Sequence, residues 1–502
     1  MLIWHPVSGI HHPNQYMNQI LFTHSYFLKL DPKQWKTMQP YPPLATLYAA
    51  SLMRTNGYMV RLFDPMFSES PSEIIPALQN QQPDIVVIYD DGFNYLTKMC
   101  LTNMREAAFE IIRFSKEQNA VVIVSSSDAS DHYEKYLAQG ADYVIIGEAE
   151  EILLELTNCL AENNIQALSS LKGIAYKENG SVHHTGRREV LKDLDALPAP
   201  AWDLVNIEEY RHRWIEKNGY FSLNMVTTRG CPYKCNWCAK PIYGNRYTSH
   251  SAERKVEELK FLLEQYKPDH IWFCDDIFGL KPGWLKTFSE KIKEAKLNFR
   301  YKIQSRADLL VEENTVQYLA ESGCETVWLG AESGSQKILD AMDKGITLAQ
   351  ICEARKLLHK YKIRCAFFLQ FGYLGETNTD EASTIRMVLD LMPDEIGISV
   401  SYPLPGTKFY EKVKNELKHK ANWTDSDDLS MMFRADLPAD YYKQLQRYVH
   451  KIYQKQRGLN NFRGFLKKPS DMNYQKLRSI AGIAWYGPYA WLTKNKLKRS
   501  WQ

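Results

Sequence analysis

Three cysteines stand within eight residues of a chain that otherwise uses cysteine sparingly. Cys231, Cys235 and Cys238 have the spacing C-x3-C-x2-C in the stretch RGCPYKCNWCAK, and the 502-residue sequence has nine cysteines in all. A closed structural zinc site needs four ligands, and no second cysteine pair or histidine pair follows at a usual distance. Three thiolates instead suit a [4Fe–4S] cluster with one iron left open. The spacing therefore predicts cluster ligands at these three positions, with structural zinc as the alternative.

A series of strands and helices must position these cysteines. From residue 221 onward, short apolar runs alternate with helical patterns, which predicts consecutive β/α units. The predicted strands are 223–228, 270–276, 300–306, 326–333, 365–373 and 395–403. The predicted helices are 252–266, 284–295, 313–322, 348–361 and 381–391. Six such units predict a partial (β/α)6 TIM-type barrel, whose chemistry gathers at the carboxyl ends of the strands, and the cysteines follow the first strand.

A second alternating series occupies the first third of the chain. The predicted strands are 1–6, 58–64, 84–90, 120–127 and 142–148, and the predicted helices are 44–55, 100–118 and 130–139. This α/β pattern predicts a doubly wound, Rossmann-like parallel sheet, whose ligands bind beyond the carboxyl ends of its strands.

These patterns divide the chain into four predicted regions. We expect a Rossmann-like domain over 1–152 and a linker region with a β-hairpin over 153–220. The partial barrel then covers 221–410, and a helical, basic C-terminal region covers 411–502.

The cysteine motif, with the aromatic Trp237 before its last cysteine, resembles the signature of the radical S-adenosylmethionine (SAM) enzymes. The resemblance implies that the amino and carboxylate groups of SAM bind the open iron. One electron from the cluster then releases a 5′-deoxyadenosyl radical that abstracts hydrogen. A single-electron donor such as flavodoxin or ferredoxin would supply that electron.

The resemblance also implies SAM contacts at the ends of the barrel strands. These residues are Trp237, Gln304, Arg306, Glu332, Ser333, Gly372 and Tyr373. Arg306 would clamp the SAM carboxylate bidentately. Each has an ordinary alternative: Arg306 would pair with a nearby acid, and Glu332 would cap the helix that begins near Ser335.

Residues 38–152 are similar to the cobalamin-binding Rossmann domain that precedes the radical domain in one subclass of the family. The similarity lies in YPPLATLYAASLMRTNGYMVRLFD, PDIVVIY and EKYLAQGADYVIIGEAEE. It implies cobalamin contacts from Ser125, Ser126, Ser127, Gly147, Glu148, Phe93 and Asn94.

The chain departs from that subclass in two respects. The segment 125–128 reads Ser-Ser-Ser-Asp where the family usually has Gly-Gly-Pro-His, so the glycines that permit close backbone approach are missing. The Asp-x-His-x-x-Gly motif for a lower axial ligand is also absent, and we interpret His132 as a surface helix residue. A Rossmann domain without cobalamin is the alternative.

The two resemblances together imply methylation of an unactivated carbon in a small-molecule or lipid-like substrate. The deoxyadenosyl radical would remove hydrogen and methylcobalamin would deliver the methyl group. Radical cyclisation, ring rearrangement or oxidation with the same cofactors is the alternative. A non-catalytic iron–sulfur binding protein is a further alternative, which would have no need of Arg306 and Glu332.

The composition excludes other classes of protein. Nine cysteines in 502 residues do not make a secreted disulfide scaffold. The opening residues MLIWHPVSGI have neither a basic region nor a long apolar run, so we expect a reducing cytoplasm. The sequence contains no run of about 18 apolar residues, so no membrane span is predicted.

The C-terminal end is unlike the rest in charge. Residues 451–502 carry twelve basic residues and one acid, a net +11, which leaves the preceding residues at −8. Within them 480–492, IAGIAWYGPYAWL, is apolar and aromatic, with basic residues on both sides. The pattern predicts that 476–502 contacts a membrane surface or a lipid-like substrate, and nucleic acid is not expected. The alternative is ordinary packing with solvated charges.

Overall fold

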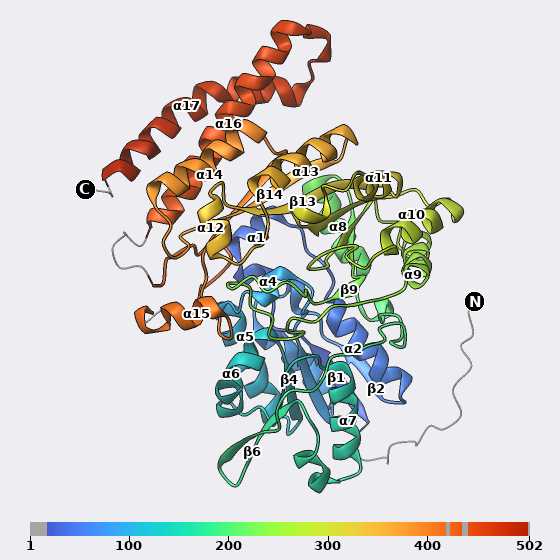
Figure 1. The fold of residues 1–502 in the computed structure, drawn as a ribbon. Helices are drawn as coiled ribbons and strands as arrows, with labels where there is room; N and C mark the ends of the chain where they lie inside the picture. The colour runs from blue at the N-terminus through green and yellow to red at the C-terminus, as the bar shows by residue number, and fades with distance from the viewer. Residues whose placement is uncertain (1–17, 418–421, 434–439, 500–502) are drawn as a thin grey trace. The chain divides into compact units, whose positions relative to one another are not determined.

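The computed structural model describes residues 18–417, 422–433 and 440–499, drawn in Figure 1. The chain forms two compact units. The first comprises Met1–Pro232, Lys240–Asp276 and Asn422–Asp427, and the second comprises Tyr233–Ala239, Ile277–Ala421 and Asp428–Gln502. The predicted strand at 1–6 lies outside the described residues.

A seven-stranded sheet forms the centre of the first unit, in the order β2-β1-β3-β4-β5-β6-β7. Its parallel strands are β1 (Gln19–Thr23), β2 (Met59–Leu62), β3 (Ile85–Tyr89), β4 (Val121–Ser125) and β5 (Tyr143–Ile145). All five residues of β3 are buried and apolar or aromatic, as expected of a strand covered on both faces. Antiparallel β6 (Ile174–Glu178) and β7 (Ser181–His184) extend the sheet into the predicted linker region.

Helices cover both faces of this sheet (Figure 1). On one side lie α2 (Leu44–Thr55) and α7 (Glu150–Ala161); on the other lie α3 (Ile75–Gln81), α5 (Thr102–Glu117) and α6 (Ser127–Ala138). The apolar core of the second side joins these helices to alternate residues of β3 and β4. The doubly wound sheet is confirmed. Sequence analysis missed β1, a short run that lies between β2 and β3 in the sheet.

The first unit continues into the second alternating series. β8 (Ser222–Met225) pairs in parallel with β11 (His270–Phe273), and α9 (Ala252–Gln265) connects them. A short antiparallel pair, β9 (Thr228–Arg229) with β10 (Thr248–Ser249), flanks the first cysteine. The remaining helices of this unit are α1 (Pro32–Thr37), α4 (Tyr95–Lys98) and α8 (Ile207–Asn218).

Four parallel strands form the sheet of the second unit, in the order β15-β14-β13-β12. They are β12 (Arg300–Ser305), β13 (Cys324–Glu332), β14 (Arg364–Phe371) and β15 (Glu395–Val400). Their helices are α10 (Trp284–Glu294), α11 (Glu313–Glu321), α12 (Gln336–Ala341), α13 (Leu348–Lys360) and α14 (Asn378–Leu391). All six strands predicted for the barrel are therefore present. The predicted boundaries of the four regions remain a prediction, since the two compact units divide the chain differently.

The two faces of the second sheet differ in character because successive side chains alternate. One face carries buried apolar residues such as Val327 and Phe367. The other carries half-buried Gln304 and Trp328, which lie side by side in the register of β12 and β13, together with buried Gln370. This mixed face is the one that offers polar groups to a ligand.

A helical C-terminal region completes the second unit, as predicted. It contains α15 (Lys408–Val413) and the long helices α16 (Tyr441–Lys467) and α17 (Tyr474–Arg499), which pack along each other (Figure 1). None of the helices described is both long enough and apolar enough to cross a membrane.

Candidate functional site

A buried carboxylate holds the turn that leads to Cys231. Asp275, just after β11, accepts hydrogen bonds from the backbone N–H groups of Thr227 and Thr228 at 2.8 and 2.5 Å. It also accepts from their hydroxyls at 3.0 and 2.8 Å. Burial raises the pKa of Asp275 to about 6, although these four donors favour the charged form. The side chain therefore fixes the path between β8 and β9.

Arg229 is buried two residues before Cys231. Its Nη1 lies 2.5 Å from Glu148 Oε1 and its Nη2 lies 2.7 Å from Glu150 Oε1. Three aromatic rings surround its guanidinium at 5.4–5.8 Å: Tyr48, Phe93 and Tyr243. Burial alone lowers the pKa of Arg229, but Glu150, Tyr243 and Glu148 outweigh it, and the net pKa lies well above the ordinary value. Arg229 therefore stays charged and ties β9 to the end of β5.

The residue between Arg229 and Cys231 must be glycine. Gly230 has φ +75°, and a Cβ there would lie 2.5 Å from the backbone oxygen of Arg246. On the other side of the cysteine, Lys240 Nζ donates to the Cys231 carbonyl at 3.0 Å. The backbone of Cys231 is thus held from both directions, and its side chain is half-buried.

The other two motif cysteines belong to the second unit. Cys235 is half-buried and Cys238 is exposed. The Nη1 of Arg306 lies 3.8 Å from Cys235 Sγ, and the guanidinium stacks over the Tyr233 ring at 3.7 Å. A cation beside a thiol favours the thiolate, which is the form that binds metal.

Asn236 anchors the stretch between these two cysteines. Its backbone N–H donates to Met342 O at 3.0 Å and its Nδ2 donates to Ala341 O at 2.6 Å, both at the end of α12. The hydroxyl of Tyr373, predicted to contact SAM, donates to Asn236 Oδ1 at 2.6 Å. In this structure Tyr373 therefore positions the cysteine stretch.

The predicted SAM residues Arg306 and Glu332 meet through Lys344. Lys344 Nζ lies 2.7 Å from Glu332 Oε1, and the Lys344 carbonyl accepts from Arg306 Nη2 at 2.7 Å. Arg306 also pairs with Asp308, at 3.0 Å from its Nε. Glu332 has φ +57° and forms this ion pair, while Ser335 begins α12 with no side-chain cap. Arg306 therefore pairs with Asp308 and Glu332 pairs with Lys344, and the contacts of both with SAM remain a prediction.

The other predicted SAM residues lie in the same unit. Trp237 has its Nε1 buried with no hydrogen-bond partner in the described part of the chain. Ser333 is buried, with its hydroxyl 3.1 Å from that of Thr384. Gly372 has φ +78° in the turn after β14, and Gln304 lies on the mixed face of the sheet. Their contacts with SAM remain a prediction.

The residues predicted to contact cobalamin are buried or half-buried in the first unit: Ser125, Ser126, Ser127, Gly147, Glu148, Phe93 and Asn94. Ser126 and Asn94 cap α6 and α4. A Cβ at Gly147 would lie 3.3 Å from Ile242 O, and Phe93 stacks on Tyr243 with centroids 6.1 Å apart. These residues hold the segment that follows the cysteines, and their contact with cobalamin remains a prediction.

Asp128 ends the segment that replaces the family's Gly-Gly-Pro-His. It forms a buried ion pair with Arg105, at 2.6 and 2.5 Å, and accepts from Tyr136 at 2.7 Å. Burial raises the pKa of Asp128, but Arg105 and Tyr136 outweigh it, so the net pKa is lowered. His132, expected at the surface, is half-buried in α6, and its Nε2 lies 4.0 Å from Asp128.

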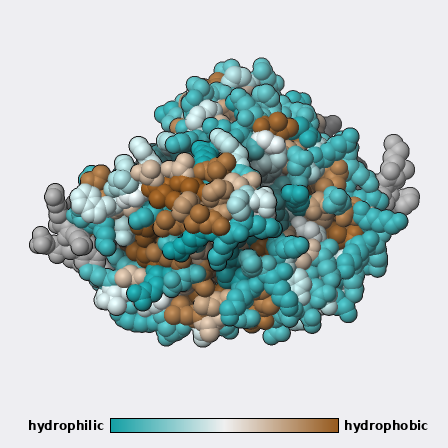
Figure 2. Space-filling view, turned by 90° about the horizontal axis from the view of Figure 1, so that it is seen from above, coloured by the Kyte–Doolittle hydropathy of each residue, from teal (hydrophilic) through white to brown (hydrophobic). Residues whose placement is uncertain are grey.

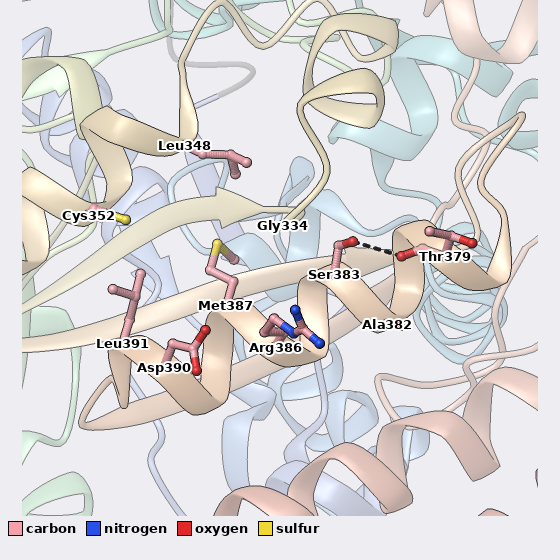
Figure 3. A pocket seen from close by; sticks show the side chains of 10 residues that line it. All are labelled: Gly334, Leu348, Cys352, Thr379, Ala382, Ser383, Arg386, Met387, Asp390 and Leu391. Atoms are coloured by element: carbon pink, nitrogen blue, oxygen red, sulfur yellow. Dashed lines mark hydrogen bonds between the residues drawn. The ribbon is translucent and has the colours of Figure 1, made fainter.

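A cavity of about 500 Å³ lies between α13 and α14 (Figure 3). Cys352 and Leu348 of α13 line it, with Arg386 and Asp390 of α14. None of the residues predicted to bind SAM lines this cavity. It is therefore distinct from the predicted cofactor contacts.

Within the described residues, no group of three or more His, Cys, Asp or Glu side chains stands in metal-ligand geometry. The cluster ligands are therefore indicated by the spacing of the cysteine motif and by the likeness of this chain to known proteins. Residues 225–388 match the model of the Radical SAM superfamily. The chain contains a radical SAM domain. The [4Fe–4S] cluster and SAM predicted from the cysteine motif are the cofactors of that family.

Curated relatives align with most of this chain. An uncharacterized methyltransferase of Pyrococcus horikoshii is 29% identical over 76% of this chain and 81% of its own. An anaerobic magnesium-protoporphyrin IX monomethyl ester cyclase of Cereibacter sphaeroides is 23% identical over 75% of this chain and 61% of its own.

Solved structures share its fold. The cobalamin-dependent SAM radical enzyme OxsB, with aqua-cobalamin bound, matches at TM-score 0.73 and 17% identity, over 96% of this chain and 72% of its own. The radical SAM methyltransferase TsrM of Kitasatospora setae, with cobalamin and a [4Fe–4S] cluster bound, matches at TM-score 0.66 and 17% identity, over 80% and 75%. The likeness to OxsB, which covers 96% of this chain, includes the doubly wound sheet as well as the second sheet.

Sequence analysis missed four residues that position the radical SAM motif: Arg229, Asn236, Asp275 and Lys344. Arg229 stands in the quoted RGC triplet and Asp275 in the FCDD that ends a predicted strand. The signal that could have identified them is a polar residue beside the cysteine motif or at the end of a predicted strand. The hydrogen-bond partners of the Arg229 and Asp275 side chains are 47 or more positions away, and no local pattern indicates them.

Proposed function

We propose that this protein is a cobalamin-dependent radical SAM methyltransferase acting on an unactivated carbon of a small-molecule or lipid-like substrate. The observation that carries the proposal is a doubly wound sheet and a radical SAM domain in one chain, an arrangement shared with two cobalamin-dependent enzymes at TM-scores of 0.73 and 0.66. The methyltransferase relative supports methyl transfer as the outcome.

The cofactors, when bound, supply a 5′-deoxyadenosyl radical and a methyl group. The chain supplies three thiolates from Cys231, Cys235 and Cys238. Arg306 Nη1 lies 3.8 Å from Cys235 Sγ, so its guanidinium would stand beside that cluster ligand. Glu332, which pairs with Lys344 at the end of β13, would offer a carboxylate oxygen to a hydroxyl or amino group of SAM.

Contacts with the two small-molecule cofactors are proposed for the residues already described. For SAM these are Trp237, Gln304, Arg306, Glu332, Ser333, Gly372 and Tyr373. For cobalamin they are Ser125, Ser126, Ser127, Gly147, Glu148, Phe93 and Asn94. A reduced flavodoxin or ferredoxin is the proposed electron donor, and a reducing cytoplasm the proposed compartment. A peripheral contact of 476–502 with a membrane is also proposed.

Ring formation or oxidation without methyl transfer is the second candidate outcome, because the magnesium-protoporphyrin cyclase is a relative. The two outcomes differ in their products. Each methyl transfer yields one 5′-deoxyadenosine and one S-adenosylhomocysteine, since a second SAM restores the methyl group on the cobalamin. Cyclisation yields 5′-deoxyadenosine without S-adenosylhomocysteine.

The test is anaerobic reconstitution with iron, sulfide and hydroxocobalamin, followed by reduction and addition of SAM. We expect about four irons and one cobalamin per chain, 5′-deoxyadenosine, and S-adenosylhomocysteine from methylation of the reduced cobalamin. Cys238→Ala should lose the cluster, whereas the matched control Cys352→Ala on α13 should keep it. A wild-type protein that holds a cluster but does not cleave SAM would identify a non-catalytic iron–sulfur protein. Cleavage of SAM without cobalamin retention would contradict the methyltransferase proposal.

A further inference from the structure

The last helix, α17, is apolar on two opposite faces. One face packs on α16 and buries Ala490, Thr493 and Leu497. Gly458 of α16 permits close approach there, because a Cβ at Gly458 would lie 2.6 Å from both Ser479 O and Ile483 Cγ1. The inner face thus accounts for only some of the apolar residues of α17, and the exposed ones need a separate explanation.

The outer face of α17 exposes large apolar side chains. Trp485 is 65% exposed, Trp491 64%, Leu477 53% and Leu492 50%. Residues 477, 485 and 492 are spaced by eight and seven, which places them on one side of a helix. Tyr489 is also exposed, and so are Phe462, Phe465 and Leu466 at the end of α16. Of the fifteen large hydrophobic side chains exposed in the described part of the chain, nine lie between 462 and 492.

These side chains form a continuous surface, which we call the hairpin face (Phe462–Leu466 and the outer side of Tyr474–Leu492). The space-filling view shows a brown hydrophobic patch surrounded by teal on the side where Figure 1 draws α16 and α17 (Figures 1 and 2). A contiguous exposed apolar patch of this kind marks an interaction site in a folded protein.

The hairpin is anchored at one end only. The first half of α16 is buried, with the Tyr441 hydroxyl donating to Glu381 of α14 at 2.8 Å and the Tyr453 hydroxyl donating to Pro393 O at 2.7 Å. From Phe462 to Ser470 every residue is exposed. The hairpin face therefore lies on the part of α16 and α17 that extends beyond this anchor.

The charge of α16 and α17 indicates what kind of partner the hairpin face binds. Neither α16 nor α17 contains an aspartate or glutamate. Basic side chains flank the hairpin face and are exposed: Arg463, Lys467, Lys468, Arg478, Lys494 and Lys496. A second copy of this chain would bring two surfaces of the same charge together, which is unfavourable. A partner with an anionic surface and an apolar layer would pair with the basic side chains and bury the exposed leucines and tryptophans.

We propose that the hairpin face docks the enzyme on an anionic lipid bilayer, with α17 in the plane of the interface. Trp485 and Trp491 would lie at the headgroup boundary, which suits rings with one polar and one apolar end. Each basic residue near an anionic surface strengthens binding by about fivefold, so a handful gives reversible attachment. The proposal does not depend on methyl transfer.

The test is partition of the reconstituted full-length protein onto vesicles, measured by co-sedimentation. Vesicles of phosphatidylcholine with about 30% phosphatidylglycerol carry the negative charge of an anionic membrane and should bind the protein. Vesicles of pure phosphatidylcholine should not bind it. Trp485→Ser with Trp491→Ser should weaken partition by about tenfold or more. Ile215→Ser with Phe261→Ser is the matched control, because both residues are 49% exposed in the first unit.

A charge variant separates the two contributions. Arg478→Glu with Lys494→Glu keeps every apolar residue and should also weaken binding to anionic vesicles by about tenfold or more. Cluster content and circular dichroism should stay unchanged in all variants, since the altered side chains are exposed. Equal partition of wild type and both hairpin variants would overturn the proposal. So would a change from dimer to monomer in the tryptophan variant without any vesicle binding by wild type, which would identify a second copy as the partner.

Discussion

Arg229 should be the residue whose loss most disturbs the path to the first cysteine. Its side chain is 2% exposed and bridges Glu148 and Glu150, whose side chains are 6% and 2% exposed. Arg229→Ala would leave two buried carboxylates without a counter-charge. Breaking a buried ion pair in this way costs about 3–5 kcal/mol. A loss of that size shifts the thermal midpoint of a unit of this size by roughly 10 °C.

The chain contains a matched control for this substitution. Arg188 also bridges two glutamates, Glu151 at 3.0 Å and Glu155 at 2.7 Å, but those side chains are 47% and 46% exposed. Exposed pairs contribute about 0–1 kcal/mol, so Arg188→Ala should shift the midpoint by about 3 °C or less. Each arginine forms two ion pairs, so the two variants differ in the burial of the pairs that are lost and not in their number.

Hydrogen exchange gives the local readout, because a chain with two compact units does not unfold in one step. Backbone amides of 145–150 and 225–231 should lose protection in Arg229→Ala and keep it in Arg188→Ala. The triple variant Arg229→Met, Glu148→Gln, Glu150→Gln removes all three charges and should recover much of the loss. Iron retention by the reconstituted protein should follow the same order. Equal midpoints and equal protection in the two alanine variants would refute the reasoning.

Two further predictions concern pH and backbone strain. Burial lowers the pKa of His250 to about 3, so between pH 6.5 and 3 the unfolded chain binds one more proton than the folded chain. Stability should therefore fall as the pH drops, by about 2 kcal/mol at pH 5, and thermal scans of His250→Gln should show a shallower slope over pH 5–7. The pKa of Asp195, the partner of His250, is lowered from its ordinary value of 3.8, so Asp195 affects stability only at more acidic pH. An unchanged slope in His250→Gln would contradict the assignment to His250. Gly230→Ala should reduce iron retention, because its Cβ would meet the Arg246 backbone at 2.5 Å; Gly244→Ala, with φ +61° and nothing within 4 Å, should retain iron.

The sequence alone determined the elements and the cysteine motif. The six barrel strands and five of their helices appear within a few residues of the predicted ranges. Hydrophobic periodicity and turn residues are local signals, so they survive without knowledge of any partner. The motif is equally local, since three ligands within eight residues can be recognised by spacing, and the match of residues 225–388 to the Radical SAM superfamily confirmed it.

Tertiary structure alone decided how the site is held. Arg229 and Glu148 are 81 positions apart, and Asp275 lies 48 positions from Thr227; ion pairs and hydrogen bonds at such separations leave no period in the sequence. The same holds for β1, whose place in the sheet is set by pairing with β2 and β3. In α17 the sequence showed apolar and basic residues together, but only packing against α16 decided which apolar side chains are buried and which remain exposed. Burial depends on what lies opposite a side chain, and that is a property of the folded chain.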